Sequence, residues 1–325
     1  SSTSRGLGDV YKRQVGIQNG CYPNQRRVRL LKTKLVVIMK NSKTPYGKAA
    51  PWMVGAIFSF ISMAIAGRAV SDQLDTFEIM LYRSLIGFLI VISTARVVNT
   101  HHEINFQNFS IHFIRNIFHF MGQNLWFFAL PLIPLAQLFA LEFTSPIWVV
   151  LLAPIFLKEK LTFRKICVAA LGFIGVLVVA RPEIGSLSIG IIAAATAAIG
   201  FAASAMITRK LTETDSLTKI LFFLTSLQII FGLICSGYDG KITIPSPDNL
   251  SWLVLIGLAG LSAHFCLTKS LTLAPASVVM PFDFVRLPLI AIIGMVFYGE
   301  DLDIFMVTGA LMILVANYIN LNHRK

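Results

Sequence analysis

The chain has 325 residues, of which 55% are hydrophobic and 14% are charged. Soluble domains carry roughly a quarter charged residues, so this composition excludes an ordinary soluble domain and indicates an integral membrane protein. The formal net charge is +12, but eleven of the 28 Lys and Arg residues and only one of the 16 acids lie within residues 1–48. The excess positive charge therefore belongs to the N-terminal segment, and we expect no nucleic-acid partner.

The N-terminal segment differs in character from the rest of the chain. The stretch "GLGDVYKRQ" resembles translated sequencing-adapter read-through, whereas Met39 opens "MKNSKTPYGKAAPW", which is typical of a natural start before a hydrophobic helix. We expect residues 1–38 to be a non-native or disordered basic leader, separate from the fold. The alternative is a native basic tail that binds anionic lipid.

Apolar runs long enough to cross a membrane fill the remainder of the chain. A spanning helix needs about 20 mostly apolar residues, and the backbone of such a run in lipid is helical because its polar groups must be satisfied internally. The sequence predicts an all-α integral membrane fold with ten spans. They are approximately Ala50–Val70, Phe77–Val98, Ile111–Leu130, Pro134–Leu157, Lys165–Ala180, Leu187–Thr208, Leu217–Gly237, Leu250–Thr272, Pro275–Tyr298 and Asp303–Leu321.

The loop charges predict the orientation of these spans. Lys and Arg concentrate in alternate loops, for example "LKEKLTFRK" and "TRKL", whereas "SDQLDT" and "GEDLD" are acidic. Cytoplasmic loops carry the excess of Lys and Arg, so we expect both termini to be cytoplasmic. We predict a multi-pass protein of the bacterial inner membrane.

The two halves of the chain repeat one another. A shift of 141 residues places "PLAQLFALEFTSPIWVVLLAPIFLKEKL" on "PASVVMPFDFVRLPLIAIIGMVFYGEDL", so that Phe143 meets Phe284 and the acids Glu142 and Asp283 coincide. Each segment contains two internal prolines. Five spans per half would insert the halves in opposite orientations, and inverted repeats with interrupted helices are typical of transporters with a site near the midplane.

These segments, together with "AIAGRAVSDQLDTFEIMLYRSLIGFLIV", resemble the two EamA repeats of the drug/metabolite transporter superfamily. The resemblance covers approximately Lys48 to His323 and is greatest to the branch that includes S-adenosylmethionine transporters. It implies ten helices in two inverted five-helix repeats, which we place at residues 39–182 and 183–325. Many substrates are carried on such repeats, so the resemblance alone does not define the substrate.

Charged residues within the apolar runs are the first candidates for a site. Asp283 and Arg286 share a helix face at i, i+3, and their repeat equivalents are Glu142 and Ser145. A charge at the membrane centre costs at least about 2.5 kcal/mol, so we expect these side chains to line a polar cavity. The alternatives are that Asp283 and Arg286 only neutralise each other, and that Glu142 titrates a proton or pairs with Arg83.

Arg83 has an alternative partner on its own helix, the acid Glu78 five residues earlier. Polar and aromatic residues on two further spans complete the set of candidates. His119, Gln123 and Trp126 share one face of the third span, which suits a flat or cationic ligand or, alternatively, hydrogen bonds between helices. The eighth span offers His264 and Lys269, of which Lys269 alternatively extends to the membrane surface.

The sequence predicts a secondary transporter for a small polar organic metabolite, such as an amino acid or an S-adenosylmethionine-like cation, driven by protons or by exchange. We expect no catalytic residues, no cofactor and no metal, and a monomer or homodimer in the lipid bilayer. The alternatives are an intramembrane enzyme acting on a lipid-linked substrate and a membrane sensor without transport.

Overall fold

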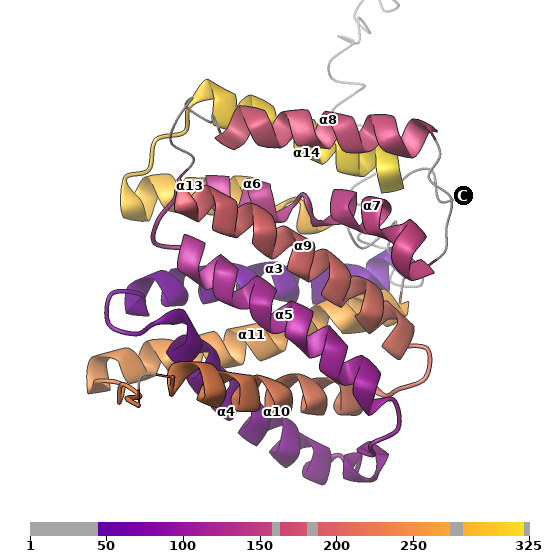
Figure 1. The fold of residues 1–325 in the computed structure, drawn as a ribbon, viewed down its shortest axis with the longest axis vertical. Coiled ribbons are helices and arrows are strands. Elements are labelled where there is room, and N and C mark those ends of the chain that lie inside the picture. Colours follow the sequence, from indigo (N-terminus) through magenta and orange to yellow (C-terminus); the bar gives the residue numbers. More distant parts are fainter. Residues whose placement is uncertain (1–44, 158–162, 181–187, 239, 274–281, 322–325) are drawn as a thin grey trace, which may run out of the picture. The chain divides into compact units, whose positions relative to one another are not determined.

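The computed structural model describes residues 45–157, 163–180, 188–238, 240–273 and 282–321. The chain divides into two compact units, Ser1–Lys48 and Ala49–Lys325, and the second contains nearly all of the described residues. Within the described ranges the secondary structure is helical, without strands (Figure 1). The elements are α3 (Pro45–Val70), α4 (Thr76–Val97), η1 (His101–Glu103), α5 (Phe109–Ala129), α6 (Leu135–Glu142), α7 (Ser145–Leu157), α8 (Phe163–Ala180), α9 (Ile189–Leu211), α10 (Leu217–Ser236), α11 (Pro247–Leu273), α13 (Arg286–Tyr298) and α14 (Ile304–Leu321).

Each of the ten predicted spans overlaps a described helix. The first part of the ninth span, residues 275–281, lies outside the described residues, as does the predicted leader 1–38. Five of the described helices, namely α3, α4, α9, α10 and α11, contain segments long and apolar enough to cross a membrane. Further apolar helices are shorter, at Leu135–Val149, Ile166–Val179, Arg286–Tyr298 and Ile304–Ile319. The length and apolar composition of these helices indicate a chain that spans the membrane.

The fourth predicted span is two helices, because proline interrupts its hydrogen bonding. Pro146 has no N–H to donate to the carbonyl of Glu142, so the α-helical ladder fails at this turn. The hydroxyl of Ser145 donates to that carbonyl instead, at 2.7 Å. The carbonyl of Phe143 accepts a hydrogen bond from the side-chain amide of Asn317 on α14, at 2.6 Å. The break between α6 and α7 is therefore stabilised by side chains.

The second repeat is interrupted at the equivalent place. Phe282 and Asp283 are helical, Phe284 and Val285 form a turn, and α13 begins at Arg286. Pro288 cannot donate to the carbonyl of Phe284, which instead accepts the closer N–H of Leu287 at 3.2 Å. With the shift of 141 residues, this turn is the equivalent of Phe143 and Thr144 in the first repeat.

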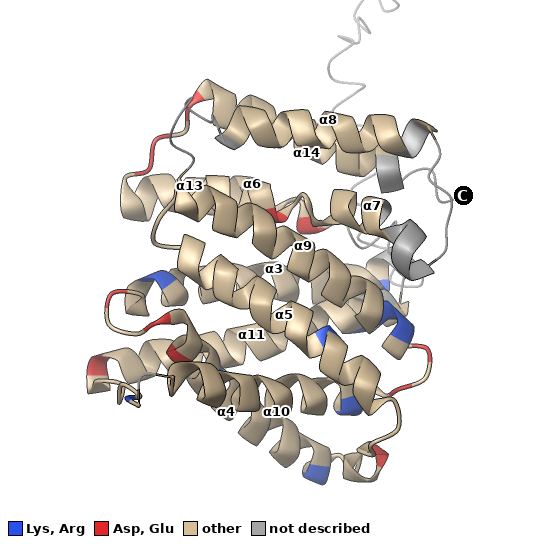
Figure 2. Cartoon of the chain, viewed as in Figure 1, with Lys and Arg blue, Asp and Glu red and all other residues tan. Residues whose placement is uncertain are grey.

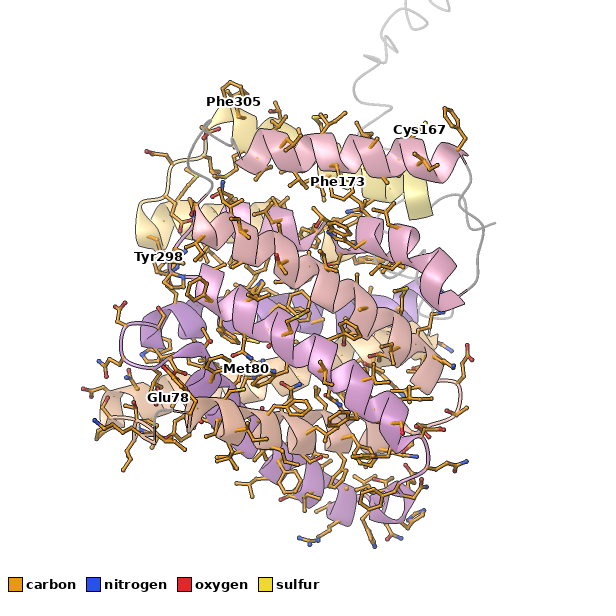
Figure 3. The ribbon with its side chains drawn as sticks, in the orientation of Figure 1. Glu78, Met80, Cys167, Phe173, Tyr298 and Phe305 are labelled. Atoms are coloured by element: carbon orange, nitrogen blue, oxygen red, sulfur yellow. The ribbon has the colours of Figure 1, made fainter. Side chains whose placement is uncertain are left out.

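Three helix pairs join the two halves: α4 packs against α10, α6 against α13, and α8 against α14. Under the shift of 141 residues, the first and third pairs are equivalent helices, whereas the equivalent of α13 is α7. Figure 1 shows α8 and α14 side by side, with α6, α7 and α13 in the adjacent layer. In Figure 3, Phe173 points from α8 toward that layer, where its ring lies 4.9 Å from the ring of Trp148 on α7. Glycines allow the α8–α14 contact, because a Cβ on Gly175 would lie 2.9 Å from the carbonyl oxygen of Gly309.

Charged residues lie mainly toward the helix ends and in loops, and long stretches of helix between them carry no charge (Figure 2). Acidic segments also occur beside the junction of α6 and α7, in the interior of the helix assembly. This interior position is where the candidate site lies.

Candidate functional site

Arg286 is the centre of the first group of buried charges. Its Nη2 donates to Oε1 of Glu142 at 2.7 Å and to Oδ2 of Asp283 at 3.1 Å. The Arg286 side chain is 3% exposed, that of Asp283 11% and that of Glu142 16%, so Glu142 is the most accessible of the three. The predicted i, i+3 pair therefore exists, but Arg286 also neutralises an acid of the other half of the chain.

Aromatic side chains surround this group, which we call the carboxylate centre (Glu142, Asp283 and Arg286). The indole Nε1 of Trp126 donates to Oε2 of Glu142 at 2.8 Å. The guanidinium carbon of Arg286 lies 4.5 Å from the ring centroid of Phe60 and 5.0 Å from those of Phe139 and Phe143. Stacking of guanidinium on aromatic rings compensates part of the cost of burying the charge.

The two helix interruptions position the carboxylate centre. Glu142 is the last residue of α6, Arg286 is the first residue of α13, and Asp283 lies just before the second turn. The rings of the equivalent residues Phe143 and Phe284 meet at right angles, with centroids 5.5 Å apart. Two acids that coincide in the sequence repeat thus meet at the interface between the two halves.

A second group of buried polar residues lies between α4, α5, α10 and α11. Arg83 Nη1 donates to Oε1 of Gln123 and contacts the sulfur of Met80 at 3.6 Å. Arg83 is paired with neither Glu142 nor Glu78, the two acids considered as its partners. Glu78 instead forms a capping box with Asp75 at the start of α4 and accepts the N–H of Thr243.

The position of Glu78 explains why it does not neutralise Arg83. Its carboxylate lies at the N-terminus of α4, where a helix favours negative charge, and accepts the backbone N–H groups of Asp75 and of Thr243 from the segment between α10 and α11. Figure 3 shows Glu78 and Met80 beside each other at this end of the helix.

His119 and His264 belong to the same second group. Their ring centroids lie 5.0 Å apart in an edge-on arrangement, although α5 and α11 come from different repeats. His119 is 3% exposed, and its Nε2 has no hydrogen-bond partner among the described residues. Both rings line a cavity of about 20 Å³ together with Arg83 and Gln228.

The structure therefore divides the predicted site residues into two groups and leaves two residues outside both. Ser145 binds the backbone carbonyl of Glu142 and thereby stabilises the helix interruption. Lys269 lies partly buried on α11 and has no ion pair with a described carboxylate.

Sequence reasoning missed Arg115, Asn116 and Gln228. Arg115 is 4% exposed; its Nε donates to the hydroxyl of Thr208 at 2.9 Å and its Nη1 to Oδ1 of Asn116 at 3.3 Å. Gln228 Nε2 donates to the carbonyl of Asn116 at 3.2 Å. The spacing of Arg115 and His119 at i, i+4 was a usable signal, and so was a lone amide in the apolar stretch "LTSLQIIFG".

Two further ion-pair groups lie toward the helix ends. Arg68 pairs with Glu300 and also donates to the carbonyls of Leu130 and Ile133, both at 2.6 Å. The other carboxylate oxygen of Glu300 accepts the N–H of Leu135 at 2.8 Å. This contact joins the ends of α3, α5 and α13 to the start of α6.

The other terminal group surrounds Asp215 in the loop between α9 and α10. The carboxylate lies 2.8 Å from Nε2 of His112 and 3.0 Å from Nζ of Lys219. Burial by itself would raise the pKa of Asp215, but hydrogen bonds from Lys219, His112 and Asn108 outweigh burial and lower its pKa. Asp215 therefore remains ionised in the folded protein.

Comparison with known proteins defines the class. The sequence model of one protein family, described as the EamA-like transporter family, matches residues 47–181 and, separately, residues 188–322. Because these matches cover most of the chain, the protein belongs to the EamA-like transporter family.

Curated relatives are transporters of small metabolites. The chain is 30% identical over 233 residues to a riboflavin transporter of Brucella anthropi, covering 70% of this chain and 80% of the relative. It is 23% identical over 282 residues to an S-adenosylmethionine uptake transporter of Rickettsia felis, covering 86% and 94%. A solved crystal structure, 16% identical, matches 84% of this chain and 96% of its own with a TM-score of 0.58, which supports the fold alone.

Proposed function

We propose that the chain is a secondary transporter that moves a small polar organic metabolite across the bacterial inner membrane by alternating access. In this proposal residues 39–182 and 183–325 are inverted five-helix halves, with both termini cytoplasmic. The observation that carries the proposal is the carboxylate centre, because it joins the two halves at their equivalent helix interruptions. Interrupted helices at a repeat interface are typical of substrate sites in secondary transporters.

The charge of this centre favours a substrate with a positive charge. Two carboxylates and one guanidinium leave one negative charge in excess, and burying an excess charge is costly without a counter-ion. Glu142 is the natural contact, since it is the most exposed member and already accepts a hydrogen bond from Trp126. Of the three rings that surround Arg286, Phe60 is partly exposed and suits a flat or cationic part of the ligand.

The two named substrates of the relatives differ in this respect. Riboflavin carries no net charge at neutral pH, whereas S-adenosylmethionine carries a sulfonium beside an amino-acid group and a flat base. The excess negative charge therefore favours an S-adenosylmethionine-like or amino-acid-like substrate over a flavin. Coupling to a proton gradient or to exchange follows from competition, because a substrate cation that reaches Glu142 displaces Arg286 from it.

Alternating access also requires contacts that open and close at the ends of the bundle. The Arg68–Glu300 group is suited to this role, because it connects both halves through one exchangeable ion pair. Its separation would release the start of α6 from the end of α13 and so free the helix that ends at Glu142.

The test is uptake of labelled S-adenosylmethionine, riboflavin and amino acids by proteoliposomes that contain the full chain. We expect saturable uptake of a cationic or zwitterionic compound that is lost in Glu142→Gln and in Asp283→Asn, while Asp301→Asn, an exposed acid, remains active. Wild-type uptake in both carboxylate variants would contradict the proposal. Binding without uptake would favour the sensor, and conversion of a substrate to product would favour the enzyme.

A further inference from the structure

Among the described residues, two buried arginines lack the counter-charge that Arg286 has. Arg83 is 8% exposed and Arg115 is 4% exposed, yet neither lies within ion-pair distance of a carboxylate of the described residues. Their hydrogen-bond acceptors are neutral: Gln123 and Met80 for Arg83, and Thr208 and Asn116 for Arg115. Buried charges are normally paired, because an unpaired one costs several kcal/mol.

The cavity beside Arg83 has the size and lining of a small polar ligand site. Its volume of about 20 Å³ holds roughly one water-sized group. Its polar lining consists of Arg83, Ser84, His119, Thr225, Gln228 and His264. Nε2 of His119 is buried without a partner, so an imidazole N–H is available there in the tautomer that protonates this nitrogen. The Arg83 guanidinium and this imidazole N–H are the donors that face the cavity, since the hydroxyl of Thr225 already donates to the carbonyl of Leu221 at 3.0 Å.

The packing of α11 against α4 preserves space for the guanidinium. A Cβ on Gly260 would lie 2.7 Å from Nη2 of Arg83, which is closer than side-chain carbons approach other atoms. Arg115 is connected to the same cavity through neutral groups, since it donates to Asn116, and Gln228 on the cavity wall donates to Asn116. Arg83 therefore lines this partly open cavity, and Arg115 lies one hydrogen-bonded residue behind its wall.

We infer that this cavity is a binding site for a small monovalent anion, either a free halide or the carboxylate group of a ligand. Arg83 supplies the charge-assisted hydrogen bonds, His119 donates through Nε2, and Arg115 adds positive potential through the Asn116–Gln228 contact. The site is separate from the carboxylate centre and does not depend on transport. Only the assignment of a bound carboxylate to the transported substrate rests on the proposed function.

The carboxylate centre and the anion site lie along one face of α5. Trp126 binds Glu142, and Gln123, three residues earlier on the same helix face, binds Arg83.

The test measures the unfolding temperature of the full chain in detergent with sodium chloride, bromide or acetate, each against gluconate at equal ionic strength. Gluconate is far larger than the cavity, whereas a halide fits within it and acetate can place its carboxylate group at the open side. We expect saturable stabilisation by halide or acetate in wild type and in Arg96→Met, an exposed cation on the same helix. Arg83→Met should weaken the apparent affinity about tenfold or more, because a charged hydrogen bond is lost.

Gly260→Ala provides a second variant should Arg83→Met fail to fold, because it keeps the charge and crowds the guanidinium. The same anion effect in wild type and in both variants would overturn the site, and so would no difference between gluconate and the small anions in wild type. Stabilisation by halides but not acetate identifies a free anion. Stabilisation by acetate but not halides identifies a carboxylate. These measurements contain no transported substrate, so they stand even if the uptake assay fails.

Discussion

Arg286 and Arg83 are both buried between helices of the two halves, but their surroundings differ. Arg286 contacts two carboxylates and three aromatic rings, whereas Arg83 contacts an amide and a thioether among the described residues. Removing Arg286 leaves two acids without a counter-charge, while removing Arg83 leaves only a neutral acceptor. Arg286 is thus part of a network of paired charges, whereas Arg83 has no carboxylate partner among the described residues.

The largest expected effect is that of Arg286→Met. Loss of one partner of a buried ion pair costs about 3–5 kcal/mol, because Glu142 and Asp283 remain buried and mutually repulsive. The matched variant is Arg83→Met, for which we expect a clearly smaller loss. The unpaired oxygen of Gln123 costs about 1–3 kcal/mol, and removal of a buried charge without a counter-charge offsets this cost. Unfolding of both variants in the same detergent measures the difference. Equal destabilisation would contradict the contrast between the two arginines.

Trp126→Phe should have the next largest effect on the carboxylate centre. The substitution keeps an aromatic ring and removes the N–H that donates to Oε2 of Glu142. A hydrogen bond to a charged group contributes about 1.5–3 kcal/mol, so we expect a loss of this size in the unfolding free energy. In the Glu142→Gln background the loss should be smaller. An unchanged loss in that background would show that the bond to Glu142 does not cause it.

Gly260→Ala tests how closely the protein packs around the Arg83 guanidinium. The added methyl group would meet the end of the Arg83 side chain, so we expect a cost at the low end of the roughly 1–3 kcal/mol for overpacking, partly offset by the higher helix propensity of alanine. In the Arg83→Met background the methionine is flexible enough to yield, so most of the cost should disappear. Additive destabilisation in the double variant would indicate that Gly260 acts through another neighbour, such as the helix backbone.

The smallest effect is that of Asp215→Asn, a charge group at the helix ends. The pKa of Asp215 is lower in the folded protein than in an unfolded chain, so its contribution to stability is complete above the unfolded pKa. That contribution is lost as pH falls through the folded pKa. We expect wild type to unfold at a higher temperature than Asp215→Asn near neutral pH, with the difference shrinking in acid. A difference independent of pH would contradict this role.

Local spacing was sufficient to predict several of these contacts. Asp283 and Arg286 at i, i+3 pair as expected, because helix geometry alone places both side chains on one face. The same holds for His119, Gln123 and Trp126, which are all buried on one face of α5. Proline spacing in the repeated segment predicted interrupted helices, and both interruptions occur at the aligned positions.

Partners from distant parts of the chain were not predictable in this way. The acid Glu142 was considered as a partner of Arg83, but it binds Arg286, 144 residues later in the chain. The His119–His264 contact joins helices of different repeats, and no spacing in the sequence predicts that these two rings meet. Such pairings depend on how α5, α6, α11 and α13 pack, which local periodicity does not encode.

The sequence by itself determined the membrane class, the approximate positions of ten apolar segments and the repeat that aligns Glu142 with Asp283. These follow from composition, length and proline chemistry, which act on neighbouring residues. Only the tertiary structure decided which groups surround each buried arginine: two carboxylates for Arg286, and an amide and a thioether for Arg83. That choice depends on which helices lie side by side, since a buried charge is stabilised by whatever group the packing brings within a few ångströms.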